Sequence, residues 1–156
     1  MYASGFANVA LGIARGMLDA LAALANEKTP RGYKSTMRMS AVIQTEIAEL
    51  EARLRAARFY IHGTLEAAWR AVQQGEMPMD HRMAIRLAAT HCIREARRIA
   101  GEAYAAAGTT SVFASNPFER RLRDINAVAQ QLQGRRSHFE TVGKYLLGLE
   151  AETLFL

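Results

Sequence analysis

The sequence has little of several residue types that mark particular protein classes. Its 156 residues include one cysteine, Cys92, so no disulfide can form within the chain. No charged-then-apolar signal segment opens it. Its apolar runs fall far short of the ~20 residues that cross a bilayer, because Arg15 and Asp19 interrupt the apolar N-terminal segment. These absences predict a cytoplasmic protein without a transmembrane helix.

Concentrated charge and catalytic motifs are also lacking. Lysine and arginine number 20 against 15 acidic residues, a net charge of +5, and the basic residues are scattered among the acidic ones. A nucleic-acid binder would need them clustered on one face, so this class is disfavoured. There is no glycine-rich phosphate loop, Gly-x-Ser-x-Gly or Cys-x-x-Cys motif, and no two of the four histidines have metal-ligand spacing on a helix. We therefore expect no metal site.

A catalytic thiol is also disfavoured. His91 and Cys92 are adjacent, and neighbouring side chains on a helix point about 100° apart, so the pair cannot share a proton easily. We expect Cys92 to be buried and inert.

The sequence does contain enough apolar material for one folded domain. Hydrophobic residues make up 50% of the chain and charged residues 22%, which is typical of a globular protein with a core. A length of 156 residues matches one compact domain and leaves no room for a second full one. We therefore treat residues 1–156 as a single domain.

The chain is predicted to be all-helical. Prolines occur only at Pro30, Pro78 and Pro117, and the long segments between them show helical periodicity without strand alternation. We expect an antiparallel up-and-down bundle of four helices with a short fifth C-terminal helix. The first expected helix ends near Asn26. The other four are expected at about Ser40–Gln74, Asp80–Ala107, Pro117–Gly134 and Ser137–Leu147, with turns at 28–35 and 109–115.

Apolar residues at steps of three and four predict which helix faces are buried. The second segment has the strongest pattern and a length on the order of 50 Å, so we expect this helix at the centre of the bundle. The third segment is dominated by alanine, which lets neighbouring helices approach closely. The expected faces are Phe6, Val9, Ile13, Met17, Leu21 and Leu24 in the first helix, Ile43, Ile47, Leu50, Leu54, Ala57, Ile61, Leu65, Ala68 and Val72 in the second, and Leu122, Ile125, Val128 and Leu132 in the fourth.

Capping residues predict where the shorter helices begin. Asn116 is expected to cap the fourth helix, with Pro117 at its first position and Glu119 returning a bond to the cap amide. Ser137 and Glu140 have the same capping-box spacing. On the surface of the fourth helix, Arg120 and Asp124 are four residues apart and are expected to pair.

Four segments resemble the C-terminal part of the acyl-CoA dehydrogenase superfamily. They are GFANVALGIAR at 5–15, AGEAYAAAG at 100–108, NPFERRLRDI at 116–125 followed by Gln130-Gln131, and GKYLLGL at 143–149. The most similar branch is that of the flavin-dependent monooxygenases, such as the oxygenases of 4-hydroxyphenylacetate, dibenzothiophene or steroid-derived phenols. The resemblance covers essentially the whole chain, but only the helical C-terminal domain of a longer architecture. Its N-terminal helical and middle β-domains are absent here.

The resemblance implies a flavin cofactor, FAD or FMN, and candidate residues that hold its phosphate. The family's basic turn before the second helix corresponds to Arg31, Lys34 and Arg38, and its loop after the third helix corresponds to Gly108, Thr109 and Ser111. The resemblance adds Arg120 on the fourth helix. In this architecture these segments lie near flavin phosphate, often that of a neighbouring subunit. A solvated basic turn without a ligand is the alternative.

The resemblance does not supply a catalytic residue. The monooxygenase branch carries a histidine in a Gln-His pair where this chain has Gln130-Gln131. Because the Gln131 amide cannot exchange a proton near neutral pH, an acid–base role is lost there. The glutamate base of the dehydrogenase branch has no identifiable counterpart either.

Two functions remain open. The first is the C-terminal, flavin-site-forming domain of an acyl-CoA-dehydrogenase-like oxidoreductase or monooxygenase, inactive by itself and completed by the missing domains, which a separate chain can carry. The second is a stand-alone helical oligomerisation protein without flavin chemistry. Either predicts a homo-oligomer, a dimer or tetramer, because so long a second helix exposes apolar surface that the other helices cannot cover, and the C-terminal segment is apolar as well. The residues expected in contacts are Tyr145, Leu146, Leu149, Leu154, Phe155 and Leu156.

Overall fold

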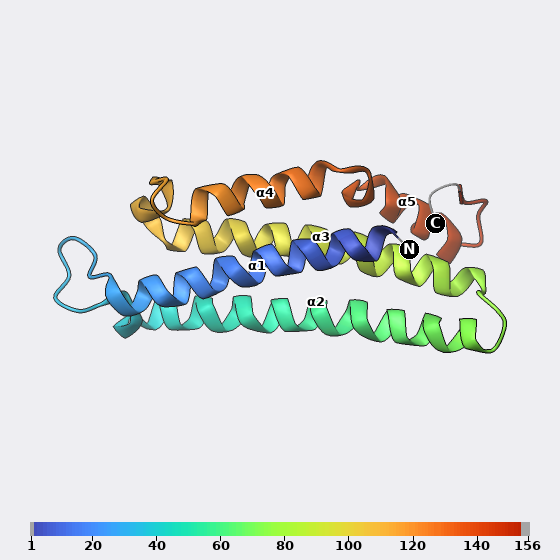
Figure 1. Cartoon of the computed structure of the whole chain (residues 1–156), viewed down its shortest axis with the longest axis horizontal. Helices are drawn as coiled ribbons and strands as arrows, with labels where there is room; N and C mark the ends of the chain where they lie inside the picture. The colour runs from blue at the N-terminus through green and yellow to red at the C-terminus, as the bar shows by residue number, and fades with distance from the viewer. Residues whose placement is uncertain (1, 154–156) are drawn as a thin grey trace.

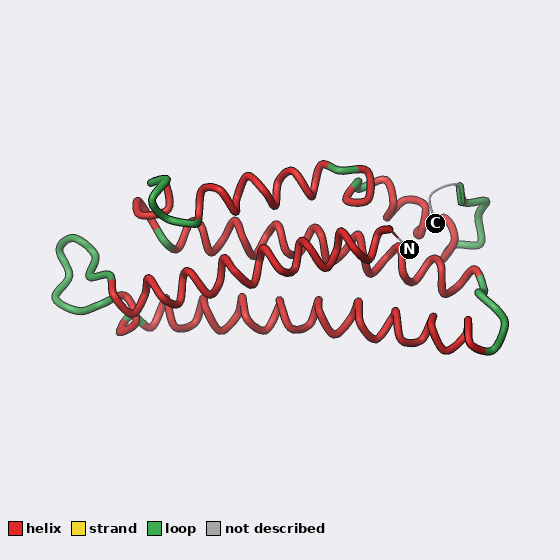
Figure 2. The backbone as a smooth tube through the Cα atoms, in the orientation of Figure 1, coloured by secondary structure: helices red, strands yellow, loops and turns green. Residues whose placement is uncertain are grey.

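The structure, a computed structural model, describes residues 2–153, and all secondary structure within them is helical (Figures 1 and 2). Figure 1 shows α1 and α3 running in one direction, with α2 and α4 running in the opposite direction. The elements are α1 Tyr2–Glu27, η1 Met37–Met39, α2 Ala41–Gln73, α3 Met79–Ala106, η2 Gly108–Val112, α4 Phe118–Gln130, η3 Leu132–Gly134 and α5 Ser137–Leu146, where η marks a 3-10 helix. The predicted up-and-down bundle with a fifth helix is confirmed.

Glycine sets the ends of two of the long helices. Gly75 follows α2 with φ +92°, and Gly108 follows α3 with φ +63°, a left-handed conformation that residues with a side chain rarely adopt. The predicted ends of these helices are therefore correct to within about a residue.

The centre of the bundle is α3, and the prediction that the second helix occupies it is wrong. α3 packs against α1, α2, α4 and α5, whereas α2 packs mainly on α1 and α3. The reason is side-chain size, because small side chains allow helix axes to approach from several sides. The fully buried small residues of α3 are Ala88, Ala89, Cys92, Ala96, Ala100 and Ala103. α2 buries a single face, formed by Leu50, Leu54, Ala57, Ile61 and Ala68.

Alanine also shifts the buried face of α1. Met17 and Leu21 are buried as predicted, but Val9 is 53% exposed. The stripe against α3 includes Ala7, Ala10 and Ala14, because close approach favours the smallest side chains. The predicted face of the first helix is thus only partly correct.

By length and composition α1 qualifies as a candidate membrane span. Its 26 residues include a window of mean hydropathy 1.4, of which 39% is buried inside the bundle. A core helix of a globular protein passes the same test, and α1 packs along α3 in this way.

The predicted caps of α4 and α5 are wrong. Asn116 does not cap α4, since its Nδ2 donates to the Thr110 carbonyl at 3.2 Å and Pro117 precedes the helix. Ser137 is the first residue of α5, and Arg136 occupies the cap position without a side-chain cap bond. Both helices therefore start without side-chain capping.

The C-terminal end of α4 also differs from the prediction. The helix stops at Gln130 rather than Gly134, because Gln131 adopts an extended ψ of 154°. On the surface of α4, an ion pair joins Arg123 Nε to Glu119 Oε1 at 2.8 Å, whereas the expected pair of Arg120 with Asp124 is not formed.

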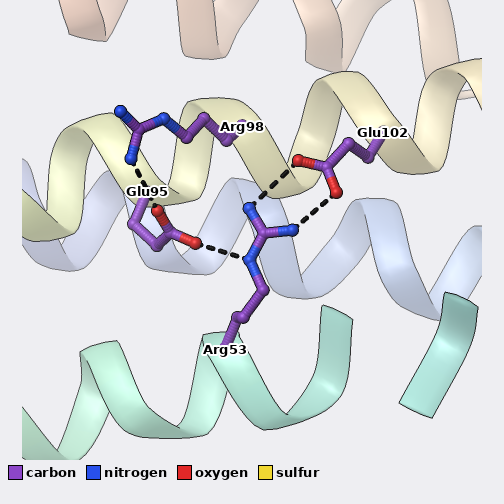
Figure 3. A network of polar contacts seen from close by, with 4 residues as sticks. All are labelled: Arg53, Glu95, Arg98 and Glu102. Atoms are coloured by element: carbon purple, nitrogen blue, oxygen red, sulfur yellow. Dashed lines mark hydrogen bonds and ion pairs between the residues drawn. The ribbon is translucent and has the colours of Figure 1, made fainter. Parts of the chain in front are cut away.

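An ion-pair network joins α2 to α3 (Figure 3). Arg53 donates from Nε to Glu95 at 2.6 Å, and from Nη1 and Nη2 to Glu102 at 2.5 and 3.0 Å. Arg98 Nη1 adds a contact to Glu95 at 3.2 Å. Burial disfavours the charge of Glu95, but the bonds from Arg53 and Arg98 outweigh burial and hold its pKa below the usual value. The network therefore fixes α2 against the central helix.

Candidate functional site

The sequence-predicted site residues lie at one end of the bundle. At this end α1 and α3 finish while α2 and α4 begin, on the left of Figure 1. Arg38 lies in η1, the residues Gly108, Thr109 and Ser111 lie in η2, and Arg120 lies in the first turn of α4. Within one chain, however, η1 packs on α1 and α2, whereas η2 packs on α3 and α4. The two segments share an end of the bundle without forming one compact cluster.

The basic turn between α1 and α2 presents its charges to solvent. Arg31, Lys34 and Arg38 are all exposed. The turn is anchored by Met37, whose side chain is buried and whose N–H donates to the Lys28 carbonyl at 2.9 Å. The Arg38 carbonyl accepts from Gln44 Nε2 at 2.8 Å. No acceptor within residues 2–153 is assigned to the Arg38 guanidinium, so the charge is available to a ligand.

The η2 segment can offer a ligand mainly its backbone groups and the exposed side chain of Thr109. Gly108 begins it in the left-handed conformation, and Thr109 is exposed. Ser111, by contrast, is 2% exposed and its Oγ donates to the Gly108 carbonyl at 2.7 Å. The Ser111 hydroxyl therefore shapes the segment from inside and is not presented to solvent.

Lys28 also lies at this end of the bundle, and the sequence alone did not identify it as a candidate site residue. Its Nζ donates to the carbonyl of Ala107, the residue that follows α3, at 2.8 Å. The two residues are 79 positions apart. No local pattern marks such a contact, since a lone lysine in a turn is ordinarily solvated.

The adjacent residues Arg120 and Arg121 have different environments. Arg121 is partly buried, and its Nη1 donates to the Gly16 carbonyl of α1 at 2.7 Å. Gly16 permits this contact, because an added Cβ would lie 3.2 Å from the guanidinium carbon of Arg121. Arg120 is exposed, and its guanidinium has no assigned partner in the described part of the chain. Arg121 is therefore a helix–helix contact, while Arg120 remains available.

Gln131 acts as a local cap. Its Oε1 accepts the N–H of Gln133 at 2.7 Å, which fixes the start of η3. It lies after α4, away from the end that carries Arg38 and Arg120 (Figure 1). The Gln131 amide thus has a structural role.

His138 is buried and serves the same region. Its Nε2 lies 2.8 Å from the Leu132 carbonyl. Burial lowers the pKa of His138, and the charges of Arg86 and Arg135 act in the same direction, although the bond to Leu132 opposes them. The His138 imidazole therefore joins α5 to η3.

Among the described residues, neither Cys92 nor a cluster of metal-ligating side chains forms a reactive centre. Cys92 is buried as predicted, its Sγ lies 3.1 Å from the Ala57 carbonyl, and burial raises the pKa of the thiol to about 12. Within residues 2–153 no group of three or more His, Cys, Asp and Glu side chains is arranged to hold a metal ion.

Apolar side chains cover parts of the surface near α2 and α5. A half-open groove of about 730 Å³ between α1 and α2 includes Phe59, which is 78% exposed. Trp69 is also exposed near the end of α2. At the end of α5 and just after it, the large apolar side chains of Leu146, Leu147 and Leu149 are exposed. The predicted contact residues Leu154, Phe155 and Leu156 lie outside the described residues.

Comparison with protein families identifies the family of this chain. The model of the acyl-CoA dehydrogenase C-terminal domain matches residues 4–134. The chain belongs to this family. An indole-3-acetate monooxygenase of Pseudomonas putida is 32% identical over 123 residues, which covers 78% of this chain and 32% of the relative. One from Acinetobacter baumannii is 27% identical over 143 residues, 91% of this chain and 37% of the relative. This acyl-CoA dehydrogenase C-terminal domain thus spans about a third of the length of these relatives.

Solved structures confirm the family's fold in this chain. XiaF from Streptomyces sp., determined in complex with FADH2 and glycerol, has a TM-score of 0.90 at 21% identity, covering 99% of this chain and 40% of that one. The HsaA monooxygenase of M. tuberculosis has a TM-score of 0.87 at 18% identity, covering 100% and 40%. Butyryl-CoA dehydrogenase of Megasphaera elsdenii has 0.76 at 22% identity, covering 93% and 36%. The expected resemblance to this superfamily and its monooxygenase branch is confirmed.

Proposed function

We propose that this chain is the C-terminal helical bundle of a flavin-dependent monooxygenase, in which it forms one wall and the phosphate-binding end of the flavin site. The observation that carries the proposal is the placement of the unpaired cations Arg38 and Arg120 at the same end of the bundle as the η2 backbone. The monooxygenase relative with 32% identity and the neighbour solved with FADH2 support the choice of chemistry.

The residues at this end fit a phosphate group. Guanidinium groups form the strongest hydrogen bonds to phosphate oxygens, and Arg38 and Arg120 are exposed to make them. The carboxyl end of α3 would repel a phosphate, because the helix dipole places about half a negative charge there. Lys28 offsets that charge through its bond to the Ala107 carbonyl. The candidate residues are thus Arg38, Gly108, Thr109 and Arg120, with Ser111 in a supporting role.

Each segment of the candidate site packs on a different pair of helices, which favours a site completed by another copy of the chain. η1 rests on α1 and α2, and η2 rests on α3 and α4. A dimer or tetramer would bring η1 of one chain toward η2 of another. Exposed Phe59, Leu146 and Leu149 supply apolar surface for such contacts, or for domains carried by a separate chain. Light scattering at 17.2 kDa across micromolar concentrations would contradict self-association.

In the mechanism that we propose, this chain binds the flavin phosphate and shields one side of the flavin from water. Reduced flavin, when bound, supplies the oxygen-activating chemistry of the monooxygenase. Arg38 and Arg120 would hold its phosphate, and the apolar helices would exclude water from one side. No residue of this chain is assigned to proton transfer, since the Gln131 amide cannot exchange a proton and is used as a cap. The isolated chain is therefore expected to give no substrate turnover.

The test is titration of the 156-residue chain with FAD by calorimetry. Arg38→Ala should weaken binding about tenfold, because a charge-assisted hydrogen bond contributes roughly 1–2 kcal/mol. Arg70→Ala is the matched control, because Arg70 is an exposed arginine paired with Glu66 near the far end of α2. Equal weakening in both variants would show that only net charge matters and would overturn the assignment of Arg38.

The second candidate is a stand-alone helical oligomerisation protein, which the loss of the histidine at Gln131 favours. It predicts self-association without measurable FAD binding. The two candidates share a cytoplasmic location, where a lone thiol stays reduced. Concentration-dependent light scattering combined with the FAD titration separates them.

A further inference from the structure

Lys28 makes contacts to three separate parts of the bundle end. Its N–H donates to the Leu24 carbonyl at 2.8 Å, so it continues the hydrogen bonding of α1. Its carbonyl accepts the Met37 N–H of η1 at 2.9 Å. Its Nζ donates to the Ala107 carbonyl at 2.8 Å, directly before η2. One residue thus joins the basic turn to the end of α3.

The side-chain contact has a clear physical role. The last carbonyls of a helix lack partners within the helix, and the Ala107 carbonyl gains one from a cation that also complements the helix dipole. A Cβ added at Gly108 would lie 3.6 Å from the Lys28 ammonium, an ordinary contact, so it is the φ of +63° that favours glycine next to this bond. Ser111 then fixes the Gly108 carbonyl. The contacts run without interruption from Lys28 into η2.

We propose that Lys28 is a positioning residue that fixes the Arg38 turn relative to η2, and that affinity for flavin phosphate depends on this coupling. The proposal rests on the proposed function for its ligand, but the coupling itself is a property of the chain alone. Lys28 acts through the segments it joins, because its half-buried ammonium is bonded to a backbone carbonyl.

The test compares three variants of the full chain. Lys28→Met keeps an unbranched side chain and removes the ammonium. Lys28→Arg keeps a cation that can reach the Ala107 carbonyl. Lys144→Met makes the same change of charge in α5, where Lys144 pairs with Glu140 on the surface. The measurements are FAD affinity by calorimetry and amide hydrogen exchange of residues 28–40 and 107–113.

Lys28→Met should speed exchange in both segments about tenfold, equivalent to about 1.4 kcal/mol, and should weaken FAD binding by a similar factor. In Lys28→Arg, the exchange rates and the FAD affinity should both stay within about threefold of those of the original chain. In Lys144→Met, neither the exchange rates nor the FAD affinity should change. If the loss of one positive charge alone were responsible, Lys28→Met and Lys144→Met would show the same changes. That result would overturn the proposal.

Other outcomes separate this inference from the proposed function. Unchanged exchange in Lys28→Met overturns the coupling, whatever the FAD result. Faster exchange with unchanged FAD affinity, while Arg38→Ala still weakens binding, overturns the positioning role and leaves the flavin site intact. If the original chain binds no FAD, the proposed function fails together with the ligand claim, and the exchange experiment still decides the coupling.

Discussion

Replacing Arg53 with methionine should destabilise the bundle, because it separates α2 from two carboxylates of the central helix. The Glu95 side chain is 11% exposed and would keep only the longer contact from Arg98, at 3.2 Å. Breaking a fully buried pair costs about 3–5 kcal/mol, whereas exposed pairs contribute less than about 1 kcal/mol. Arg53 is 35% exposed and Glu102 45%, so solvent screening reduces the effect. We expect a loss of about 2 kcal/mol for Arg53→Met at pH 7.

The assay is urea unfolding followed by circular dichroism at one fixed protein concentration. Arg70→Met is the control, because Arg70 and Glu66 form an exposed pair, and it should change stability by less than about 0.5 kcal/mol. Adding Glu95→Gln to Arg53→Met should recover about half of the loss, since a neutral amide tolerates burial better than an unpaired carboxylate.

The pH dependence gives a second check on the same reasoning. The folded-state pKa of Glu95 is depressed, so its contribution is present above the unfolded value of about 4.3 and is lost as pH falls through the folded value. The difference between the original chain and Arg53→Met should therefore narrow below about pH 4. A difference that is under about 0.5 kcal/mol at pH 7, or that stays constant down to pH 3, would refute the argument.

Three further predictions test other parts of the fold. Gly134→Ala would place a Cβ 2.7 Å from the Ala129 carbonyl oxygen and should lower the free energy of unfolding by about 2 kcal/mol, while Gly12→Ala, with open space at its Cβ, should raise it by about 0.5–1 kcal/mol in the same urea assay. Cys92, with its pKa raised to about 12, should not react with a thiol reagent at pH 8 until the protein unfolds, and prompt reaction of the native chain would contradict its burial. Because burial lowers the pKa of His138, its contribution is present above the unfolded value of about 6.5 and is lost as pH falls. Acidification from pH 7 to 5 should thus destabilise the original chain more than His138→Gln, and equal pH slopes would contradict this.

The helical layout was predictable from the sequence, because glycine and proline end the long segments and apolar spacing is strong between them. The position of the central helix was not. Large residues such as Leu50 and Ile61 dominate the visible periodicity of α2, whereas the core is set by how closely backbones approach. The informative signal was the alanine spacing of α3, where Ala89, Ala96 and Ala103 recur every seven residues and are fully buried.

The candidate site was predictable only in part. A family resemblance identifies Arg38, Gly108 and Arg120, whose side chains or backbone remain at the surface. It does not identify Lys28, because the Ala107 carbonyl that Lys28 binds lies 79 residues away, and backbone carbonyls leave no mark in a sequence. The predicted cap at Asn116 failed for a different reason, since the Asn116 side chain bonds the Thr110 carbonyl, a local partner six residues back, instead of the helix terminus.

The basic residues at this end of the bundle divide into two kinds, and the division explains how a rigid scaffold can leave charge free for a ligand. Lys28 and Arg121 each donate to a backbone carbonyl of another helix region, Ala107 and Gly16 respectively. Such a bond needs no acidic partner, so Lys28 and Arg121 fix the helices without using a carboxylate. The neighbouring Arg120 is exposed and makes no ion pair among residues 2–153, so its guanidinium is left for a ligand. A bundle end held together by carboxylates would be rigid too, but it would repel the phosphate that we assign to it.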